Sequence, residues 1–319
     1  MIEINNLVKN YGPKFAVDDI SIKVSKGEIV GFLGPNGAGK STTMNILTGY
    51  LSSTSGEAKV GGIDILENPY EAKKLIGFLP EQPPLYMDMK VDEYLNFVYE
   101  IKHCKLNREK HLAEVRQVTK IDDVKNRLIK NLSKGYRQRV GIAQALIGNP
   151  PVIIFDEPTV GLDPKQIIEI RNLIRNLGQT HTVILSTHIL SEVQAICDRI
   201  IIINEGKIIA DEKTENITRV VEENRQYTVK VCGPQREVLS ALRNINGVVS
   251  AEVTGEREMD SYTYLLEAER GVDVRKPVFY AMSERGWPII GMEAVGMNLE
   301  EVFIKIMDAD LAKRARAGK

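Results

Sequence analysis

The chain has 319 residues, enough for two domains, and its 42 basic and 43 acidic residues leave a formal net charge of −1. This balance excludes a general electrostatic attraction to nucleic acid or to an anionic lipid surface. The three cysteines are scattered, which fits a reducing compartment. Because no apolar run approaches the roughly 18 residues that cross a bilayer, we expect a soluble protein, with any membrane role supplied by a partner.

An aromatic residue, Tyr11, lies in a predicted turn between two strands expected over 2–8 and 20–24. A tyrosine in such a loop is usually surface or core filler. Its position ahead of the glycine-rich run described next also suits a ring on which adenine stacks. Tyr11 is therefore a candidate for nucleotide binding.

The most strongly patterned stretch is the run 31–42, which follows the apolar pair Ile29-Val30 and precedes a helical pattern that begins near Lys40. Strand, turn and helix in this order, with the spacing G-x-x-x-x-G-K-[ST], predict a phosphate-binding P-loop. Its glycines let consecutive backbone N–H groups surround a polyphosphate, and the helix start adds the positive end of its dipole. Lys40 would reach the β- and γ-phosphates, and the Ser41 hydroxyl would take one Mg²⁺ position. The residues of this run predicted to bind nucleotide are Gly34, Pro35, Asn36, Gly37, Ala38, Gly39, Lys40, Ser41 and Thr42.

The middle of the chain changes from α/β to helical patterning. A hairpin is expected over 58–65, and a short strand that begins at Ile76 runs into a loop stiffened by three prolines within residues 80–84. From 91 to 124 the pattern is helical and polar, which indicates a helical subdomain inserted into the α/β core. Ser133 is then a credible N-cap for the next helix.

Two acids follow a buried strand in the second half of the chain. The run 152–155 is continuously apolar, as expected of a central parallel strand, and it ends in Asp156 and Glu157. Ligands meet open α/β sheets at the carboxyl ends of such strands. The next apolar strand, 182–186, ends just before His188. Between them a helix is expected to be capped by Asp163-Pro164 and closed by Gly178.

After a predicted hairpin over 200–210, the composition becomes charged and polar over 211–223, which indicates a linker. The residues beyond it predict the order β-α-β-β-α-β, the ferredoxin-like arrangement, with a last helix over 299–307. We therefore expect a small α+β domain at the C-terminus.

The order and spacing of these motifs resemble the ATP-binding cassette of ABC proteins over residues 1–215. The resemblance implies an α/β P-loop NTPase cassette with a helical subdomain at about 91–150, followed by an accessory ferredoxin-like domain over 220–319. The signature region is similar to that of ABC-2-type exporters, and 161–170 is similar to gliding-motility and multidrug-type members. The matching motifs are Gly34–Thr42 for Walker A, Val152–Asp156 for Walker B, Leu132–Tyr136 for the family signature, Gly161–Asp163 for the D-loop and His188 for the switch histidine.

The resemblance also implies a mechanism. Asp156 would hold Mg²⁺ through water, Glu157 would polarise the attacking water, and His188 would contact the γ-phosphate. In this family the signature cannot reach its own P-loop, so Ser133 and Gly135 would bind the γ-phosphate of ATP held by a second cassette. The implied protein is thus an ATPase that uses ATP and Mg²⁺ and forms a homodimer when ATP binds.

Two places depart from the usual family pattern. Lys134 and Tyr136 stand where the signature usually has Gly and Gln. The loop that usually offers a glutamine to the metal has Glu81 at that position with Gln82 beside it, and the sequence leaves open which of the two serves.

The function implied is export of an unidentified substrate through a separate transmembrane permease, a short helix of which would dock on the helical subdomain. The chain would then lie at the cytoplasmic face of the cell membrane.

The alternative is a non-transport ABC ATPase that acts as a switch on a ribosome or DNA complex. Such proteins usually have two cassettes or a long coiled-coil insert, and this chain has one cassette and no heptad run, so no nucleic-acid partner is expected. A module that senses ATP without cleaving it is disfavoured by the presence of both Glu157 and His188.

Overall fold

The computed structural model describes residues 1–216, 226–254, 260–269 and 272–295, and they form two compact units, within 1–214 and within 215–308. Each unit has its own hydrophobic core and is described by itself.

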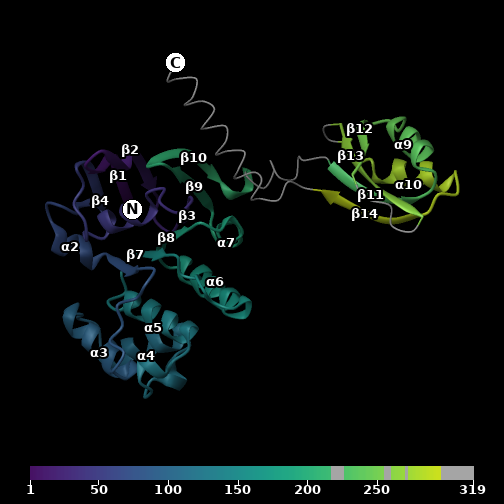
Figure 1. Ribbon diagram of the computed structural model, residues 1–319. Coiled ribbons are helices and arrows are strands. Elements are labelled where there is room, and N and C mark those ends of the chain that lie inside the picture. The colour runs from purple at the N-terminus through teal and green to yellow at the C-terminus, as the bar shows by residue number, and fades with distance from the viewer. Residues whose placement is uncertain (217–225, 255–259, 270–271, 296–319) are drawn as a thin grey trace. The chain divides into compact units, whose positions relative to one another are not determined.

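The larger unit is built on a six-stranded sheet in the order β10-β9-β3-β8-β7-β6 (Figure 1). All neighbours in it pair in parallel except β9 and β10, which form an antiparallel hairpin. Every residue of β3 and β7 is buried. Their apolar sequences predicted this, because a strand covered on both faces must be apolar along its length. The strands are β3 (Ile29–Leu33), β6 (Ile76–Leu79), β7 (Val152–Asp156), β8 (Thr182–Thr187), β9 (Arg199–Asn204) and β10 (Lys207–Lys213).

A second, antiparallel sheet has the order β2-β1-β4-β5. Its strands are β1 (Ile2–Tyr11), β2 (Lys14–Val24), β4 (Ser55–Val60) and β5 (Ile63–Asp64). One apolar cluster joins residues of β1, β2 and β4 to residues of β3, β7, β8 and β9, together with Met44, Ile46 and Leu47 of helix α1 (Lys40–Leu47). The core of this unit therefore connects the two sheets, and α1 packs within it.

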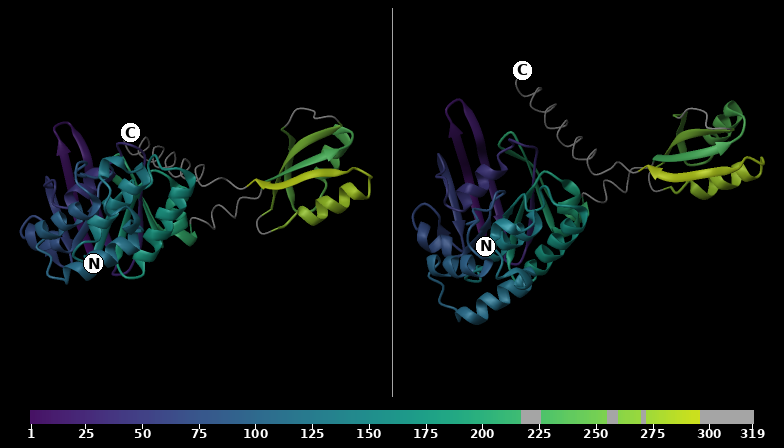
Figure 2. Two further views of the ribbon diagram at one scale, coloured as in Figure 1. Left: turned by 90° about the horizontal axis from the view of Figure 1, so that it is seen from below. Right: turned by 60° about the horizontal axis from the view of Figure 1, so that its bottom comes forward.

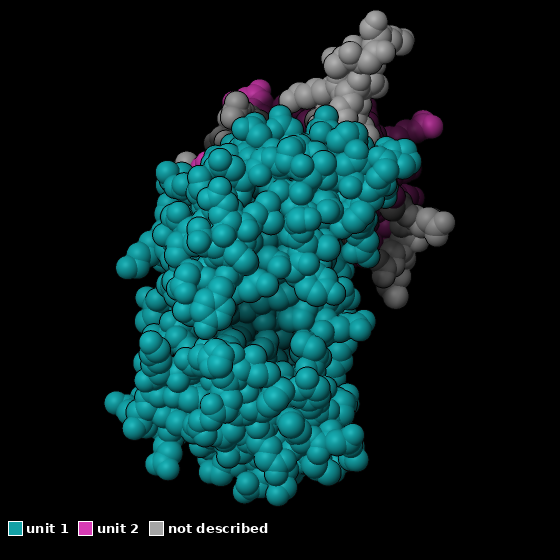
Figure 3. Space-filling view, turned by 90° about the vertical axis from the view of Figure 1, so that its left-hand side faces the viewer, with its two compact units in different colours: residues 1–214, 309–319 teal, residues 215–308 magenta. Residues whose placement is uncertain are grey.

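Helices complete this unit. They are α2 (Pro69–Lys74), α3 (Val91–Ile101), α4 (Arg108–Thr119), α5 (Lys134–Leu146), α6 (Pro164–Gly178) and α7 (Leu190–Ile196), with 3₁₀ turns η1 (Asp122–Val124) and η2 (Ile129–Asn131). Contacts tie α5 to β6, α7 to β3 and β8, and α6 to β8. Figure 3 shows one face of the unit, which is hollowed between an upper part and a lower part.

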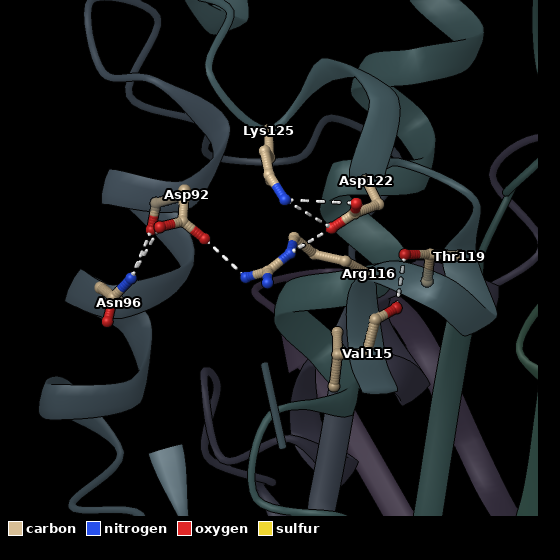
Figure 4. Close-up of polar contacts among 7 residues, drawn as sticks. All are labelled: Asp92, Asn96, Val115, Arg116, Thr119, Asp122 and Lys125. Atoms are coloured by element: carbon tan, nitrogen blue, oxygen red, sulfur yellow. Dashed lines mark hydrogen bonds and ion pairs between the residues drawn. The ribbon is translucent and has the colours of Figure 1, made fainter. Parts of the chain in front are cut away.

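Ion pairs and caps hold the helical part, α3 to α5, together. Arg116 of α4 bonds Asp92 of α3 at 2.6 Å and Asp122 of η1 at 2.9 Å (Figure 4). The ammonium of Lys102, just after α3, donates to three carbonyl groups at the end of α5, those of Gln144, Ala145 and Ile147, at 2.9 to 3.3 Å. A cation there satisfies carbonyls that the helix leaves unpaired and complements its dipole. These contacts fix α5 relative to α3 and α4.

The smaller unit contains β11 (Gln226–Cys232), α9 (Gln235–Arg243), β12 (Val248–Val253), β13 (Ser261–Ala268), α10 (Arg275–Ser283) and β14 (Ile289–Val295). This is the β-α-β-β-α-β order expected from the sequence, and its antiparallel sheet has the strand order β12-β13-β11-β14 (Figure 2). Val238 and Leu242 of α9 and Val278 and Met282 of α10 are fully buried against the sheet, in one cluster with Tyr264. The helix expected over 299–307 lies outside the described residues.

Of two expectations about element ends, the linker boundary is wrong and the end of the helix at Gly178 is confirmed. The predicted linker over 211–223 begins too early, because Asp211 to Lys213 belong to β10 and the Arg199 guanidinium bonds the Asp211 carboxylate. Gly178 is the last residue of α6, as the sequence predicted, and it does not have a positive φ. A Cβ there would lie 2.2 Å from Cδ1 of Ile29, so this glycine instead allows α6 to pack closely on β3.

Candidate functional site

The glycine-rich loop lies between β3 and α1, as the sequence predicts, and its glycines permit close backbone approaches. A Cβ on Gly34 would lie 2.3 Å from the carbonyl oxygen of Ile203, and one on Gly39 would lie 2.3 Å from that of Ala16. Gly39 also has φ of 109°, a conformation that residues with a side chain rarely adopt. The loop therefore requires glycine for its shape, whether or not a phosphate is bound.

Lys40 begins α1 and its ammonium group lies within the curve of this loop. Its Nζ donates to the carbonyl oxygens of Gly34 at 2.7 Å and Pro35 at 3.2 Å, and lies 3.6 Å from Oε1 of Glu157. Burial lowers the pKa of Lys40, while the carboxylates of Glu157 and Asp156 oppose that change. A buried cation held by backbone carbonyls is placed to bind an anion that enters the loop.

The two acids and the histidine meet where β7 and β8 end. Asp156 is 4% exposed and accepts a hydrogen bond from the Ser186 hydroxyl at 2.7 Å. Glu157 has a φ of 50°, and its backbone N–H donates to the Ser186 carbonyl at 2.9 Å. Its side chain is buried, and both carboxylate oxygens lie 3.0 Å from Nδ1 of His188. The neighbouring ends of β7 and β8 thus bring the carboxylate and the histidine together, and the loop after β3 brings Lys40 to them, which sequence spacing alone could only suggest.

Lys40, Glu157 and His188 line one cavity of about 510 Å³. Of the predicted nucleotide and catalytic residues, those that line it are Tyr11, Asn36, Gly37, Gly39, Lys40, Ser41, Thr42, Glu81, Glu157 and His188. Gly34, Pro35, Ala38 and Asp156 belong to the same loop and strand end but do not line the cavity. The cavity contains the Tyr11 ring, the backbone of the glycine-rich loop, the Lys40 ammonium and the Ser41 hydroxyl. These are the kinds of group that bind the base and the phosphates of a nucleoside triphosphate.

Three lining residues were missed by the sequence reasoning, namely Lys14, Ala16 and Val160. Lys14 and Ala16 belong to β2, which folds back beside the loop after the Gly12-Pro13 turn. The only signal for Lys14 was a basic residue three positions after Tyr11, and its meaning depends on the hairpin register, in which Tyr11 pairs with Lys14. Tyr11 is 52% exposed, so its ring is accessible to a ligand.

The loop after β6 places Glu81 and Gln82 differently. Glu81 lines the cavity that contains Lys40 and Glu157. Gln82 lines a neighbouring cavity of about 350 Å³, to which Glu81 also contributes. The geometry therefore favours Glu81 for the metal-facing position, a choice that the sequence had left open.

The signature residues do not line the cavity. The exposed Ser133 is the N-cap of α5, and its hydroxyl accepts from the backbone N–H of Tyr136 at 3.4 Å. The Tyr136 hydroxyl donates to Asp123 at 2.8 Å, so this unusual signature residue is anchored on η1. Gly135 is covered by Gln166 of α6, whose side chain a Cβ would meet at 2.6 Å. Ser133 and Gly135 therefore remain candidates only for a nucleotide bound by another molecule.

A metal would need oxygen atoms from its ligand as well as from the protein. Among the described residues, no group of three or more His, Cys, Asp and Glu side chains could hold a metal ion. Ser41, Asp156 and Glu81 supply hard oxygen donors, the kind that Mg²⁺ prefers, and Mg²⁺ sites in nucleotide enzymes are commonly completed by phosphates and water. The donor set therefore fits Mg²⁺ that arrives with a triphosphate.

Within the described ranges, no helix has both the length and the apolar character to cross a membrane.

Comparison with known proteins gives a consistent result. A family model described as "ABC transporter" matches residues 17–160. The bacitracin transport ATP-binding protein BcrA of Bacillus licheniformis is 32% identical over 317 residues, which cover 96% of this chain and 97% of that protein. The linearmycin resistance ATP-binding protein LnrL of Bacillus subtilis is 35% identical over 77% of this chain and 79% of that one. A dimeric structure of the cassette MJ0796 in a post-hydrolysis state, bound to ADP and Pi, aligns with a TM-score of 0.61 and 29% identity, covering 67% of this chain and 99% of that one.

Proposed function

This chain belongs to the ABC transporter family as an ATP-binding, ATP-hydrolysing cassette subunit, and from that premise we propose that two copies pair around ATP and drive export through a separate transmembrane permease. The transport and resistance names of the relatives described above favour this proposal over the alternative of a switch on a ribosome or DNA complex. The proposal rests chiefly on one observation. Lys40, Glu157 and His188 share one cavity, whereas Ser133, at the start of α5, does not line it. Because the family resemblance assigns Ser133 a γ-phosphate, we infer that this phosphate belongs to ATP held by a second molecule.

Within this site each side chain has a distinct task. Lys40 and the backbone N–H groups of residues 37–42 bind the phosphates, and Tyr11 stacks on the base. Ser41, Asp156 through water and Glu81 would hold Mg²⁺, which when bound would offset the negative charge of the phosphates. Glu157 accepts a proton from the attacking water, and His188, 3.0 Å from it, keeps the carboxylate oriented toward the γ-phosphate.

The permease would dock beside the loop that contains Glu81. The 350 Å³ cavity there is lined mainly by apolar and long side chains, including Pro83, Leu85 and Met87. Next to this loop, Tyr86 makes edge contacts with Tyr94 and Phe97 of α3, at centroid distances of 6.1 and 5.2 Å. Tyr94 itself is buried, so Tyr86 and the half-buried Phe97 are the aromatic residues available to a partner. A short amphipathic helix would fit this combination of groove and rings.

For the cargo we propose an antibiotic. The names of two relatives state bacitracin transport and linearmycin resistance, and the first is similar to this chain over both of its units. A strain that expresses this chain with its permease should tolerate such compounds at higher concentrations than a strain with the Lys40→Ala variant. Equal tolerance towards every compound of this kind would contradict the proposed cargo while leaving the ATPase assignment intact.

The cassette mechanism is tested with two variants of the full chain. Glu157→Gln should retain ATP binding, release phosphate about 10²–10⁴-fold more slowly, and accumulate as an ATP-bound dimer, because the general base is lost while the phosphate contacts remain. Lys40→Ala should lose ATP binding and stay monomeric. Phosphate release by Glu157→Gln at the wild-type rate would refute the base assignment, and an ATP-loaded Glu157→Gln protein that stays monomeric with and without its permease would refute the pairing.

A further inference from the structure

A third acid, Glu192, lies beneath the site and has no part in the mechanism above. It belongs to the short helix α7, and it is 1% exposed although glutamate is seldom buried. A buried carboxylate that only packed the core would be a costly choice, because its desolvation must be offset by hydrogen bonds or an opposite charge. Its contacts therefore indicate what it does.

Both oxygens of Glu192 accept hydrogen bonds from threonine hydroxyls. Thr159 donates to Oε1 at 2.5 Å and Thr187 donates to Oε2 at 3.0 Å, and both threonines are buried. Thr159 lies two residues after Glu157, and Thr187 immediately precedes His188. A single carboxylate thus connects the two segments that present the proposed base and the switch histidine.

The opposite charge near Glu192 is only partly engaged. The Arg171 guanidinium of α6 approaches Oε1 at 4.0 Å, and its buried Nε has no hydrogen-bond partner among the described residues. Both hydroxyl bonds are therefore shorter than the approach of the Arg171 guanidinium to the carboxylate. They are also the contacts that bear on the geometry of Glu157 and His188.

We propose that Glu192 is a positioning residue for ATP hydrolysis, which holds the segments after Glu157 and before His188 so that these two side chains stay 3.0 Å apart. This inference rests on the roles proposed above for Glu157 and His188. The proposed role is to position the catalytic pair, and the side-chain hydrogen bonds of Glu192 go to Thr159 and Thr187. The Thr187 carbonyl also accepts from the Gly34 N–H at 3.4 Å, so the measured Kd for ATP shows whether loss of Glu192 disturbs the glycine-rich loop as well.

The first test separates turnover from binding in the full-length chain. Glu192→Ala should lower kcat roughly tenfold to hundredfold, the size of effect that a small misplacement of catalytic groups produces, while the Kd for ATP changes less than about twofold. Thr159→Val and Thr187→Val keep the side-chain shape and should each give a smaller loss of the same kind. Thr119→Val removes a buried hydroxyl that donates to the Val115 carbonyl within α4, and it should leave kcat unchanged. Wild-type kcat in all three site variants would overturn the proposal.

The second test asks whether Glu192 acts through His188. In a His188→Ala background, the further loss of kcat caused by Glu192→Ala or Thr187→Val should be clearly smaller than in the wild-type chain, because there is no histidine left to position. Losses by the same factor in both backgrounds would assign Glu192 a merely structural role and overturn the inference. If His188→Ala alone hydrolyses ATP normally, the role proposed for His188 is wrong and this inference fails with it.

Discussion

The pairing model makes its sharpest prediction at Ser133, because the chain contains a matched control. Ser133→Ala removes the N-cap hydroxyl of α5, which accepts from Tyr136 N–H at 3.4 Å. Asn107→Ala removes the N-cap of α4, whose side chain accepts from Lys110 N–H at 3.1 Å. Both caps are exposed and both belong to the helical part of the larger unit. Of these two residues, only Ser133 is proposed to bind the γ-phosphate of ATP held by a second molecule.

The structure sets the size of each effect. Loss of an N-cap costs about 0.5–2 kcal/mol, and the long, exposed bond of Ser133 places it at about 0.5–1 kcal/mol, which lowers the melting temperature of a unit of this size by about 1–4 °C. Asn107→Ala should cost a similar amount. A hydrogen bond to a charged group contributes about 1.5–3 kcal/mol, so Ser133→Ala should additionally weaken ATP-driven pairing by at least tenfold.

The assay is ATP hydrolysis measured against protein concentration, with thermal unfolding of each variant alongside. Ser133→Ala should require at least tenfold more protein than Asn107→Ala to reach the same specific activity, although the two melt at similar temperatures. Superimposable activity curves for the two variants would show that Ser133 is only a helix cap and would refute this part of the pairing model.

Three further predictions concern other parts of the chain. Burial lowers the pKa of Lys102 from its ordinary value near 10.5 to about 8, so between these two pH values the unfolded chain binds more protons than the folded chain. The free energy of unfolding should therefore rise with pH in this range by at most about 3 kcal/mol, and urea titrations of Lys102→Met should not show that rise. Gly77→Ala would place a Cβ 2.4 Å from the backbone oxygen of Ala145 and should lower the free energy of unfolding by about 1–3 kcal/mol or more. Gly291→Ala, where the nearest atom to a Cβ is 3.7 Å away, should change it by less than about 0.5 kcal/mol, and equal losses by denaturant titration would contradict the clash. Removal of Mg²⁺ with EDTA should stop phosphate release and be reversed by added Mg²⁺, and release that continues in EDTA would exclude the metal from the reaction.

Local sequence determined much of this protein because several of its functional features are set within a few residues. The glycine-rich loop before α1 depends on glycines at fixed spacing, and the start of α5 depends on Ser133 as a cap, so the positions of both were predicted correctly. The strand before Asp156 was recognisable because a strand covered on both faces must be continuously apolar. Each of these signals arises from backbone geometry or burial of contiguous residues.

Features that depend on which segments become neighbours needed the tertiary structure. Glu81 and Gln82 are adjacent in sequence, and only the path of the chain after β6 places Glu81 on the nucleotide cavity. Gly178 was expected to close a helix and does so, but the close approach of α6 to β3, which leaves no room for a Cβ there, is visible only in the tertiary structure. A glutamate in a short helix usually faces water, so the burial of Glu192 became visible only once β7, β8 and α7 were brought together. Sequence fixes what each residue can do chemically, whereas contacts between distant segments, which form only when the two sheets and their helices pack, decide which residues do it together.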